Sequence, residues 1–439
     1  MHNRTEHDSL GDETLPNNAW YGIQTLRALR NFNTSGVPIH HFQDLINTLT
    51  MVKEASAEAN HELGLLSSKK ANAIRQACMR IREGELHNQF VVDLIQGGAG
   101  TSTNMNANEV IANLALSVMG HEKGEYQYLH PNNDVNKSQS ANDAYATATR
   151  LSIVLSTQTL THALSSIKKS LKTKSEEFAQ TPLIRSAHLQ DTVIKMLGSE
   201  FKDFTLSLEK EIVNIQSACT QLCAVNLDST SHDHANNTHP DYSQSAIKHL
   251  TRISSLPITP EKGSTDNESS MEVFVKISAI QRKLAIKLSK ICSEICILSN
   301  DPLTNFNEIN LPVAQAGSSL VPGVSSPVIP EAVSQTAFQV IGHDVTVCMA
   351  AEAGSQQLNA MEPVIIYNIL NSMKMLSSAI YMLDHRCIRG ITSNNPPIQL
   401  NIPDNRLLAA LMPTLSYGTH PLNHLSSAAA NTSPMKTAI

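Results

Sequence analysis

The sequence contains few aromatic residues, few charges and no long hydrophobic run. Of its 439 residues, 4% are aromatic and 16% are charged, whereas about 25% charged residues is usual for a soluble domain. We therefore expect much of the surface to be hidden in contacts between subunits. A net charge of −6 without a basic cluster argues against nucleic acid as a partner. No apolar run reaches the roughly 18 residues that span a bilayer, so no membrane partner is expected.

The cysteines form neither a disulfide framework nor a metal motif. There are 7 of them, an odd number, and no pair has CxxC spacing. Cys219 and Cys223, like Cys292 and Cys296, are four residues apart in helical patterns, which predicts small buried side chains in a reducing compartment. The first residues lack the apolar core of a signal peptide. We therefore expect a cytoplasmic protein.

Apolar side chains recur at spacings of three and four residues over long stretches, which predicts long amphipathic helices. The clearest stretch runs from Val273 to Leu298. Shorter ones lie at 160–171 and 204–215, and further long helices are expected over about 327–353 and 363–386. The fold class predicted is all-α, an elongated bundle of long helices.

Polar segments separate these helices. The first 40 residues are expected to be irregular, and the last dozen, rich in Ser, Asn and Ala, to be disordered. The connections rich in Gly, Asn, Ser and Pro lie at 97–108, 130–143, 226–241, 300–326 and 392–404.

One connection leads into a helix and carries several hydroxyl groups. The segment Gln96–Val110 reads QGGAGTSTNMNANEV, and its Ser, Thr and backbone N–H groups at a helix N-terminus could hold a carboxylate. It lacks the pattern of a phosphate-binding P-loop. Taken alone, such a segment is more often a structural cap.

The segment Gly317–Glu331, GSSLVPGVSSPVIPE, resembles the signature loop of the aspartase/fumarase superfamily, GSSxMPxKxNP followed by VxPE. Gln96–Val110 is similar to the first block of aspartases. His130–Thr147 and Ser186–Phe201 are similar to the second and third blocks, and His188 is expected next to a helix start. Further segments that resemble aspartase are Trp20–Ala28, Glu308–Pro312, Ala350–Asn368 and Arg386–Asn394.

The resemblance implies roles for individual residues. Ser318 would be the base that removes a proton beside one carboxylate of a succinate-type substrate. His188 would pair with Glu331, since a carboxylate on one imidazole nitrogen fixes the tautomer. The enediolate would be stabilised by Thr101, Ser140 and Ser319. Asn142 and His188 would hold the second carboxylate, and neither a cofactor nor a metal ion is implied.

Several positions depart from the family. Val324 stands where the signature has Lys, Ser326 where it has Asn, and Ala187 and Ala141 each where a block has Thr. A glycine-rich family stretch is replaced by 226–239, which has no glycine. The residues His232, Asp233, His234 and His239 in that stretch suggest either a metal site or, more simply, a solvated polar loop.

Two hypotheses follow, and we favour the first. The first hypothesis is an aspartase-like lyase that eliminates ammonia or a related group, with altered specificity because the losses cluster around the second carboxylate. Alternatively, it is an inactive homologue with a structural, regulatory or partner-binding role. Unmodified aspartase activity is a third possibility that Val324 argues against.

The architecture implied by the resemblance is a homotetramer with a twenty-helix core, in which three subunits supply each site. The expected divisions are an N-terminal mainly helical domain over 1–136, a central long-helix bundle over 137–390, and an eroded C-terminal region over 391–439. The helical stripes need such partners, because a lone bundle would expose them.

Overall fold

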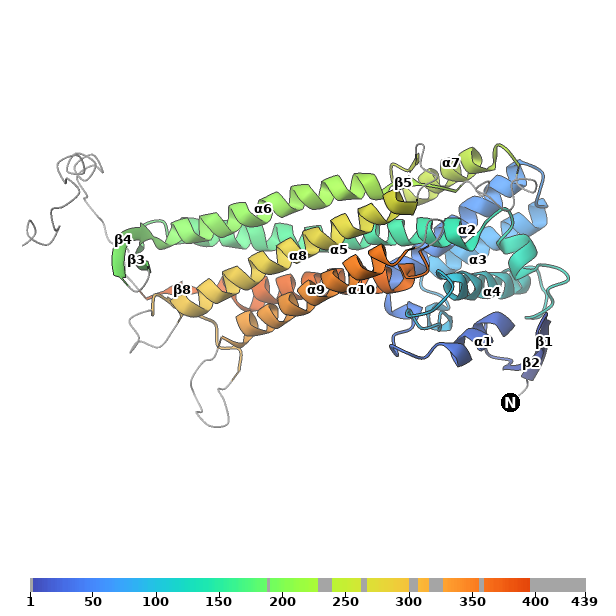
Figure 1. The fold of residues 1–439 in the computed structure, drawn as a ribbon, viewed down its shortest axis with the longest axis horizontal. Helices are drawn as coiled ribbons and strands as arrows, with labels where there is room; N and C mark the ends of the chain where they lie inside the picture. The colour runs from blue at the N-terminus through green and yellow to red at the C-terminus, as the bar shows by residue number, and fades with distance from the viewer. Residues whose placement is uncertain are drawn as a thin grey trace, which may run out of the picture.

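Long helices lie side by side along the molecule, which is elongated (Figure 1). They pack in a closed ring in the order α5, α6, α8, α9 and α10. The computed structural model describes residues 3–187, 190–227, 239–261, 267–299, 307–315, 327–354 and 359–394. The all-α long-helix bundle predicted from the sequence is confirmed. The bounds are α5 Ala141–Glu177, α6 Leu197–Leu222, α8 Asn267–Leu298, α9 Val328–Glu352 and α10 Glu362–Arg386.

Helices α9 and α10 begin and end within about one residue of the bounds that the sequence predicts, whereas α5, α6 and α8 are longer than the predicted apolar stripes. The apolar stripe of α8 from Val273 to Leu298 is buried. Helix α9 starts directly after Pro327, and α10 carries Pro363 in its first turn. Proline suits these positions because its missing N–H has no intrahelical partner there.

Shorter helices form one end of the molecule (Figure 1). Helix α2 packs against α3, α5 and α7, and α3 packs against α4. Their bounds are α1 Ile23–Asn31, α2 Gln43–Glu62, α3 Ser68–Arg82, α4 Thr101–Val118 and α7 Tyr242–Ser254. Short turns of 3₁₀-helix cover Ile39–His41, His87–Gln89 and Ile388–Gly390, and Pro131–Val135 is π-helical.

The strands pair two by two. Within the described residues, three pairs are antiparallel and one, β5 with β6, is parallel. The bounds are β1 Asn3–Asp8, β2 Gly11–Pro16, β3 Pro182–Ala187, β4 Gln190–Met196, β5 Ala224–Val225, β6 Thr259–Pro260, β7 Ile309–Asn310 and β8 Thr392–Ser393.

Two sequence predictions are wrong here. The first 40 residues contain a hairpin and α1; Gly11, with φ +110°, allows the tight turn between β1 and β2. The helix expected next to His188, a residue outside the described part of the chain, begins only at Leu197, because Gln190–Met196 forms β4. The β-branched run Thr192–Ile194 favours a strand, and the interpretation as a helix start overlooked it.

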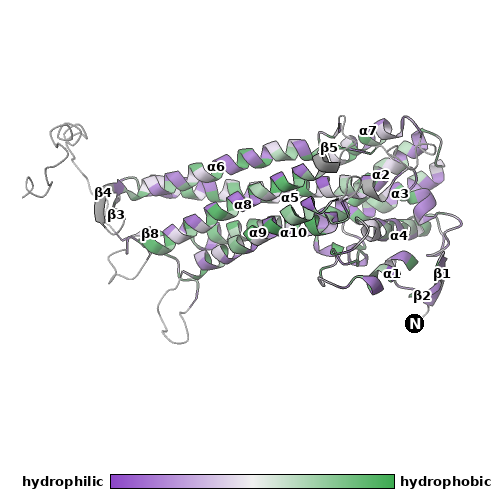
Figure 2. Ribbon diagram, viewed as in Figure 1, coloured by the Kyte–Doolittle hydropathy of each residue, from purple (hydrophilic) through white to green (hydrophobic). Residues whose placement is uncertain are grey.

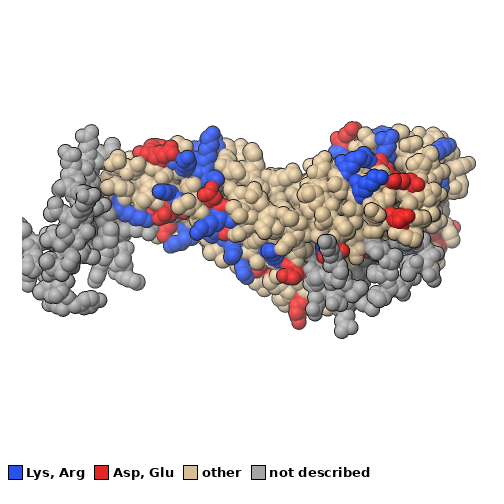
Figure 3. Space-filling view, turned by 90° about the horizontal axis from the view of Figure 1, so that it is seen from above, with Lys and Arg blue, Asp and Glu red and all other residues tan. Residues whose placement is uncertain are grey.

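The surface of the bundle is unusually apolar. Phe338, Val345 and Met349 on α9 are 63%, 56% and 68% exposed, and Val213 on α6 and Tyr381 on α10 are similarly open. Hydrophobic residues follow the bundle helices (Figure 2), and charged side chains are sparse along the middle of the body (Figure 3). Large exposed apolar surfaces mark interaction sites. None of the described helices combines the length and apolar character needed to cross a membrane.

All seven cysteines are free thiols. Most of them are buried or half-buried in helices, as the spacing predicts, whereas Cys348 is exposed. Burial raises the pKa of the Cys387 thiol to about 12. Such buried thiols behave as small hydrophobic side chains rather than as nucleophiles.

Candidate active site

Thr101 is the first residue of α4. Its hydroxyl donates to the backbone oxygen of Gly98 at 2.7 Å, and its side chain is exposed at the helix N-terminus. The preceding Gly98, Ala99 and Gly100 all have positive φ angles, which turns the chain sharply into the helix. The first-turn N–H groups and the helix dipole favour an anion at such a position.

Ser140 is the N-cap residue of α5. Its hydroxyl oxygen accepts the N–H of Asp143 at 3.1 Å and its side chain is half-buried. Because this bond uses only a lone pair, the hydroxyl proton stays free to be donated elsewhere. Ser140 therefore offers the same kind of group as Thr101, a hydroxyl at the N-terminus of a long helix.

The beginnings of α4 and α5 lie against each other. A Cβ placed on Gly100 would stand 2.3 Å from Cδ1 of Tyr145, and Gly100 has φ +83°. Only glycine can occupy this position. The contact brings the helix end that carries Thr101 next to the first turns of the helix that carries Ser140. We call this region the hydroxyl cradle, comprising Thr101, Ser140 and the segment 136–140.

Tyr145 lies under the hydroxyl cradle. Its ring is fully buried and its hydroxyl has no hydrogen-bond partner among the described residues. Burial raises the pKa of this phenol well above its usual value, and the neighbouring carboxyl of Glu362 adds a smaller effect in the same direction. Burial also raises the pKa of Glu362 to about 7, against a hydrogen bond from Thr149. Both side chains are buried next to the cradle, and burial favours the neutral form of each.

Glu331 lies in a different region of the molecule, in the first turn of α9. Its side chain is exposed and has no hydrogen bond or ion pair with the described residues. Burial raises the pKa of the Cys296 thiol near the end of α8, and the charge of Glu331 raises it further by a smaller amount. Glu331 is therefore presented at the surface, free to contact another chain or a ligand.

One chain does not bring Glu331 and the cradle together. The end of α5 remote from Ser140 lies at the Glu331 end of the bundle, where Lys174 Nζ donates to the backbone oxygen of Ile391 at 2.7 Å. At 1.5 Å per residue, the 34 steps of helix from Ser140 to Lys174 span roughly 50 Å. Figure 1 shows the start of α9 and the start of α5 at opposite ends of the bundle.

The remaining predicted site residues lie outside the part of the chain that is described. These are His188, Ser318 and Ser319, together with the substituted positions Val324 and Ser326. Asn142 belongs to α5, but its side chain is not among those described. Of the residues suggested for a metal site, only His239 is described, and its ring lies 3.8 Å from the Asp241 carboxylate.

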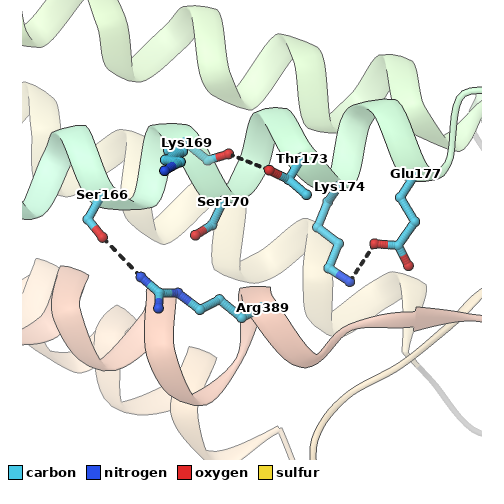
Figure 4. A pocket seen from close by; sticks show the side chains of 7 residues that line it. All are labelled: Ser166, Lys169, Ser170, Thr173, Lys174, Glu177 and Arg389. Carbon is cyan, nitrogen blue, oxygen red and sulfur yellow. Dashed lines mark hydrogen bonds and ion pairs between the residues drawn. The ribbon is translucent and has the colours of Figure 1, made fainter.

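A separate hollow of about 380 Å³ lies on the second half of α5 (Figure 4). Its cations are largely engaged: Lys174 pairs with Glu177 at 2.8 Å, and Arg389 with Asp384 at 2.9 Å. None of the predicted site residues that the structure describes lines it. The lining residues are Ser166, Lys169, Ser170, Thr173, Lys174, Glu177 and Arg389.

Sequence reasoning missed the groups that hold the cradle in place. Lys53 on α2 is fully buried and donates to Asn136 and Gln139 in the segment 136–140. A signal was present, because Lys53 follows Leu45 and Leu49 at helical spacing on the buried stripe of α2. A lysine on an apolar stripe is rarely buried without a specific partner.

Comparison with known proteins assigns the family. The chain matches the model of the family described as Lyase over residues 11–342. That match covers most of the chain, so the chain belongs to this lyase family, and the predicted membership of the superfamily is confirmed.

Individual relatives agree. The chain is 48% identical to an aspartate ammonia-lyase of Pseudomonas canavaninivorans over 94% of this chain and 88% of that protein. With the aspartate ammonia-lyase of Escherichia coli K12 the identity is 44%, covering 89% of this chain and 82% of that one.

Solved structures also agree. A fumarate lyase:delta crystallin of Brucella melitensis bound to cobalt superposes with a TM-score of 0.90 at 43% identity, over 98% of this chain and 94% of that one. The class II fumarase of Schistosoma mansoni gives 0.87 at 28% identity, over 95% and 90% of the two chains.

Proposed function

We propose that this protein is an aspartase-like lyase that eliminates ammonia, or a related group, from a succinate-type carboxylate substrate. The observation that carries the proposal is the hydroxyl cradle, where the N-termini of α4 and α5 meet and present Thr101 and Ser140. The first-turn N–H groups of two helices, together with the free hydroxyl proton of Ser140, suit a carboxylate on which negative charge develops. The similarity to aspartate ammonia-lyases along 94% of the chain supports the reaction class.

In the proposed mechanism Ser318 removes the proton beside one carboxylate. Thr101, Ser140 and Ser319 donate hydrogen bonds to the resulting enediolate, and the amine leaves from the adjacent carbon. His188, oriented by Glu331, and Asn142 hold the second carboxylate. Hydrogen bonds that strengthen as charge develops lower the barrier to reaction. Hydrogen bonds that are equally strong in the bound substrate and in the transition state do not lower it.

Specificity is proposed to differ from that of an ordinary aspartase. Val324 replaces a lysine of the signature, and a charge-assisted hydrogen bond is worth about 1.5–3 kcal/mol. Ala187 in place of threonine removes about 1 kcal/mol more. Both losses concern the second carboxylate, so the preferred substrate is proposed to carry a smaller or less anionic group there.

The complete site is proposed to form in a homotetramer. The roughly 50 Å of helix between the cradle and the Glu331 end prevents one chain from closing a site. The exposed apolar residues of α9, such as Phe338 and Met349, supply a surface for neighbouring subunits. Light scattering after gel filtration tests this, since a mass of one subunit would contradict it. We also propose a cytoplasmic location, in keeping with the seven free thiols.

The activity assay follows fumarate absorbance with aspartate, with fumarate plus ammonia, and with a panel of succinate-type analogues. We expect turnover of at least one analogue, and we expect Ser318→Ala to abolish it. An inactive homologue, which Val324 and Ala187 favour as the second candidate, predicts a folded tetramer without turnover of any compound. Strong turnover of aspartate would contradict the proposed change in specificity.

A further inference from the structure

Lys53 is an unusual buried residue. It lies in the middle of α2, has no exposed surface, and forms no ion pair with a carboxylate among the described residues. Burial of an ammonium without a counter-ion costs desolvation free energy. An apolar residue of similar volume at this position would normally make the protein more stable. The lysine therefore calls for a reason other than packing.

Its hydrogen bonds supply that reason. Nζ donates to Oδ1 of Asn136 at 2.7 Å and to Oε1 of Gln139 at 2.8 Å. The two amide side chains in turn bind the backbone of their own segment: Asn136 Nδ2 donates to the oxygen of Gln139, and Gln139 Nε2 donates to the oxygens of Val135 and Lys137. Lys53 thus fixes the two side chains that shape the approach to Ser140.

The same contact reaches α4. Oδ1 of Asn136 also accepts Nδ2 of Asn104 at 3.1 Å and Nδ2 of Asn108 at 3.2 Å. Asn104 lies one helical turn after Thr101. A single amide oxygen therefore joins α2, α4 and the segment 136–140, and so joins the elements that carry Thr101 and Ser140.

The segment needs such support. Ser138 has φ +59°, a left-handed conformation that costs a non-glycine residue energy. Asn60 of α2 adds two outer bonds, donating to the oxygen of Lys137 at 2.9 Å and accepting the Ser138 hydroxyl at 2.7 Å. A strained segment persists only where its surroundings determine it.

We propose that Lys53 is a positioning residue of the active site, which holds Asn136 and Gln139 so that Ser140 and Thr101 stay in register for the substrate carboxylate. Its effect on turnover rests on the proposed lyase function, whereas its effect on the segment does not. Burial lowers the pKa of the Lys53 ammonium to about 7, an effect that the Cys78 thiol of α3 partly offsets.

The test replaces Lys53 with methionine, which keeps the length of the side chain and removes its donors. A matched control is Lys287→Met on α8, which removes the bonds from Lys287 to Glu211 and to the backbone oxygen of Ser207, away from the cradle. Both variants are expected to melt at lower temperature. Hydrogen exchange at the amides of 135–140 and 101–104 should speed up about tenfold or more in Lys53→Met alone.

Kinetics give a second, independent result. Because a misplacement of about 1 Å can cost a hundredfold, we expect kcat of Lys53→Met to fall about 10- to 100-fold, with KM changed less than about threefold. Lys287→Met should keep both constants. Unchanged exchange at 135–140 in Lys53→Met, or an equal fall of kcat in both variants, would overturn the proposal.

A further variant guards against failure of Lys53→Met to fold. Gln139→Met removes one acceptor of Lys53 from the segment side and leaves the lysine bound to Asn136. We expect the same local increase in exchange and a smaller fall of kcat. If the wild-type protein turns over no compound, the proposed function fails, and the exchange results still decide whether Lys53 holds the segment.

Discussion

The two regions that carry the candidate site differ in how completely one chain builds them. The hydroxyl cradle is held by hydrogen bonds from α2 and α4 and by the contact of Gly100 with Tyr145. Glu331, at the start of α9, is exposed and has no partner among the described residues. The cradle is pre-organised within the subunit, and we propose that other chains complete the Glu331 end.

Replacing Gly100 should break the pre-organised region most strongly. In Gly100→Ala the new Cβ would meet the ring of Tyr145 at 2.3 Å, in addition to the strain of φ +83°. Gly120→Ala is a matched control with the same φ and nothing within 4 Å. We expect the control to lose about 1 kcal/mol of stability. Gly100→Ala should lose about 3 kcal/mol or more of stability, and its kcat/KM should fall at least about a hundredfold. Denaturant unfolding and steady-state kinetics check this, and equal losses would contradict it.

A pair of substitutions compares the two regions directly. Ser140→Ala removes the N-cap of α5 and a predicted substrate donor, so both stability and kcat should fall, by about 1 kcal/mol and about 10- to 100-fold. Glu331→Gln should lower kcat by a similar factor but change stability by less than about 0.5 kcal/mol, since the side chain has no partner within its described chain. Thermal unfolding at a fixed protein concentration separates them. A large loss of stability in Glu331→Gln would argue for a structural role.

Restoring the signature lysine sharpens the account of specificity. Val324→Lys returns a charge-assisted bond to the second carboxylate, and the expected gain in kcat/KM for aspartate is about 10- to 100-fold. Val324→Met, similar in length but uncharged, is the control and should give no gain. Equal activity of the two variants with aspartate would show that the charge at this position is irrelevant.

The smallest expected effect concerns pH. Burial lowers the pKa of Lys53 to about 7, below its value in the unfolded chain, so between these values the unfolded chain binds more protons. Stability should therefore rise with pH, by about 1 kcal/mol between pH 7 and pH 8. The rise should be absent from Lys53→Met. Urea unfolding at both pH values measures it, and the same slope in both proteins would assign the titration to another group.

The sequence predicted the long helices well and the short elements poorly. The stripe from Val273 to Leu298 repeats over many turns, so α8 was foreseen, and α9 and α10 begin within about one residue of their predicted starts. The β1–β2 and β3–β4 hairpins were missed because short strands carry little periodic signal and depend on pairing between segments.

The sequence predicts the candidate site residues, and the structure describes where three of them lie, Thr101, Ser140 and Glu331. Thr101 and Ser140 both lie at helix N-termini that meet, in agreement with the predicted cradle. Sequence spacing could not show that Glu331 lies at the other end of the bundle, because that follows from the lengths and packing of α5 and α9. Lys53 was missed because a charged residue on a helix is usually assumed to face solvent.

The central claim is that the cradle of one subunit works with Glu331 of another. Mixing unfolded Ser140→Ala and Glu331→Gln chains, refolding them together and measuring lyase activity tests it most directly. If the two residues of a site come from different subunits, random assortment should give an intact Ser140 and an intact Glu331 together in roughly a quarter of the sites. Each parent variant alone should be nearly inactive. Activity of the refolded mixture no higher than that of the two parents would contradict the account.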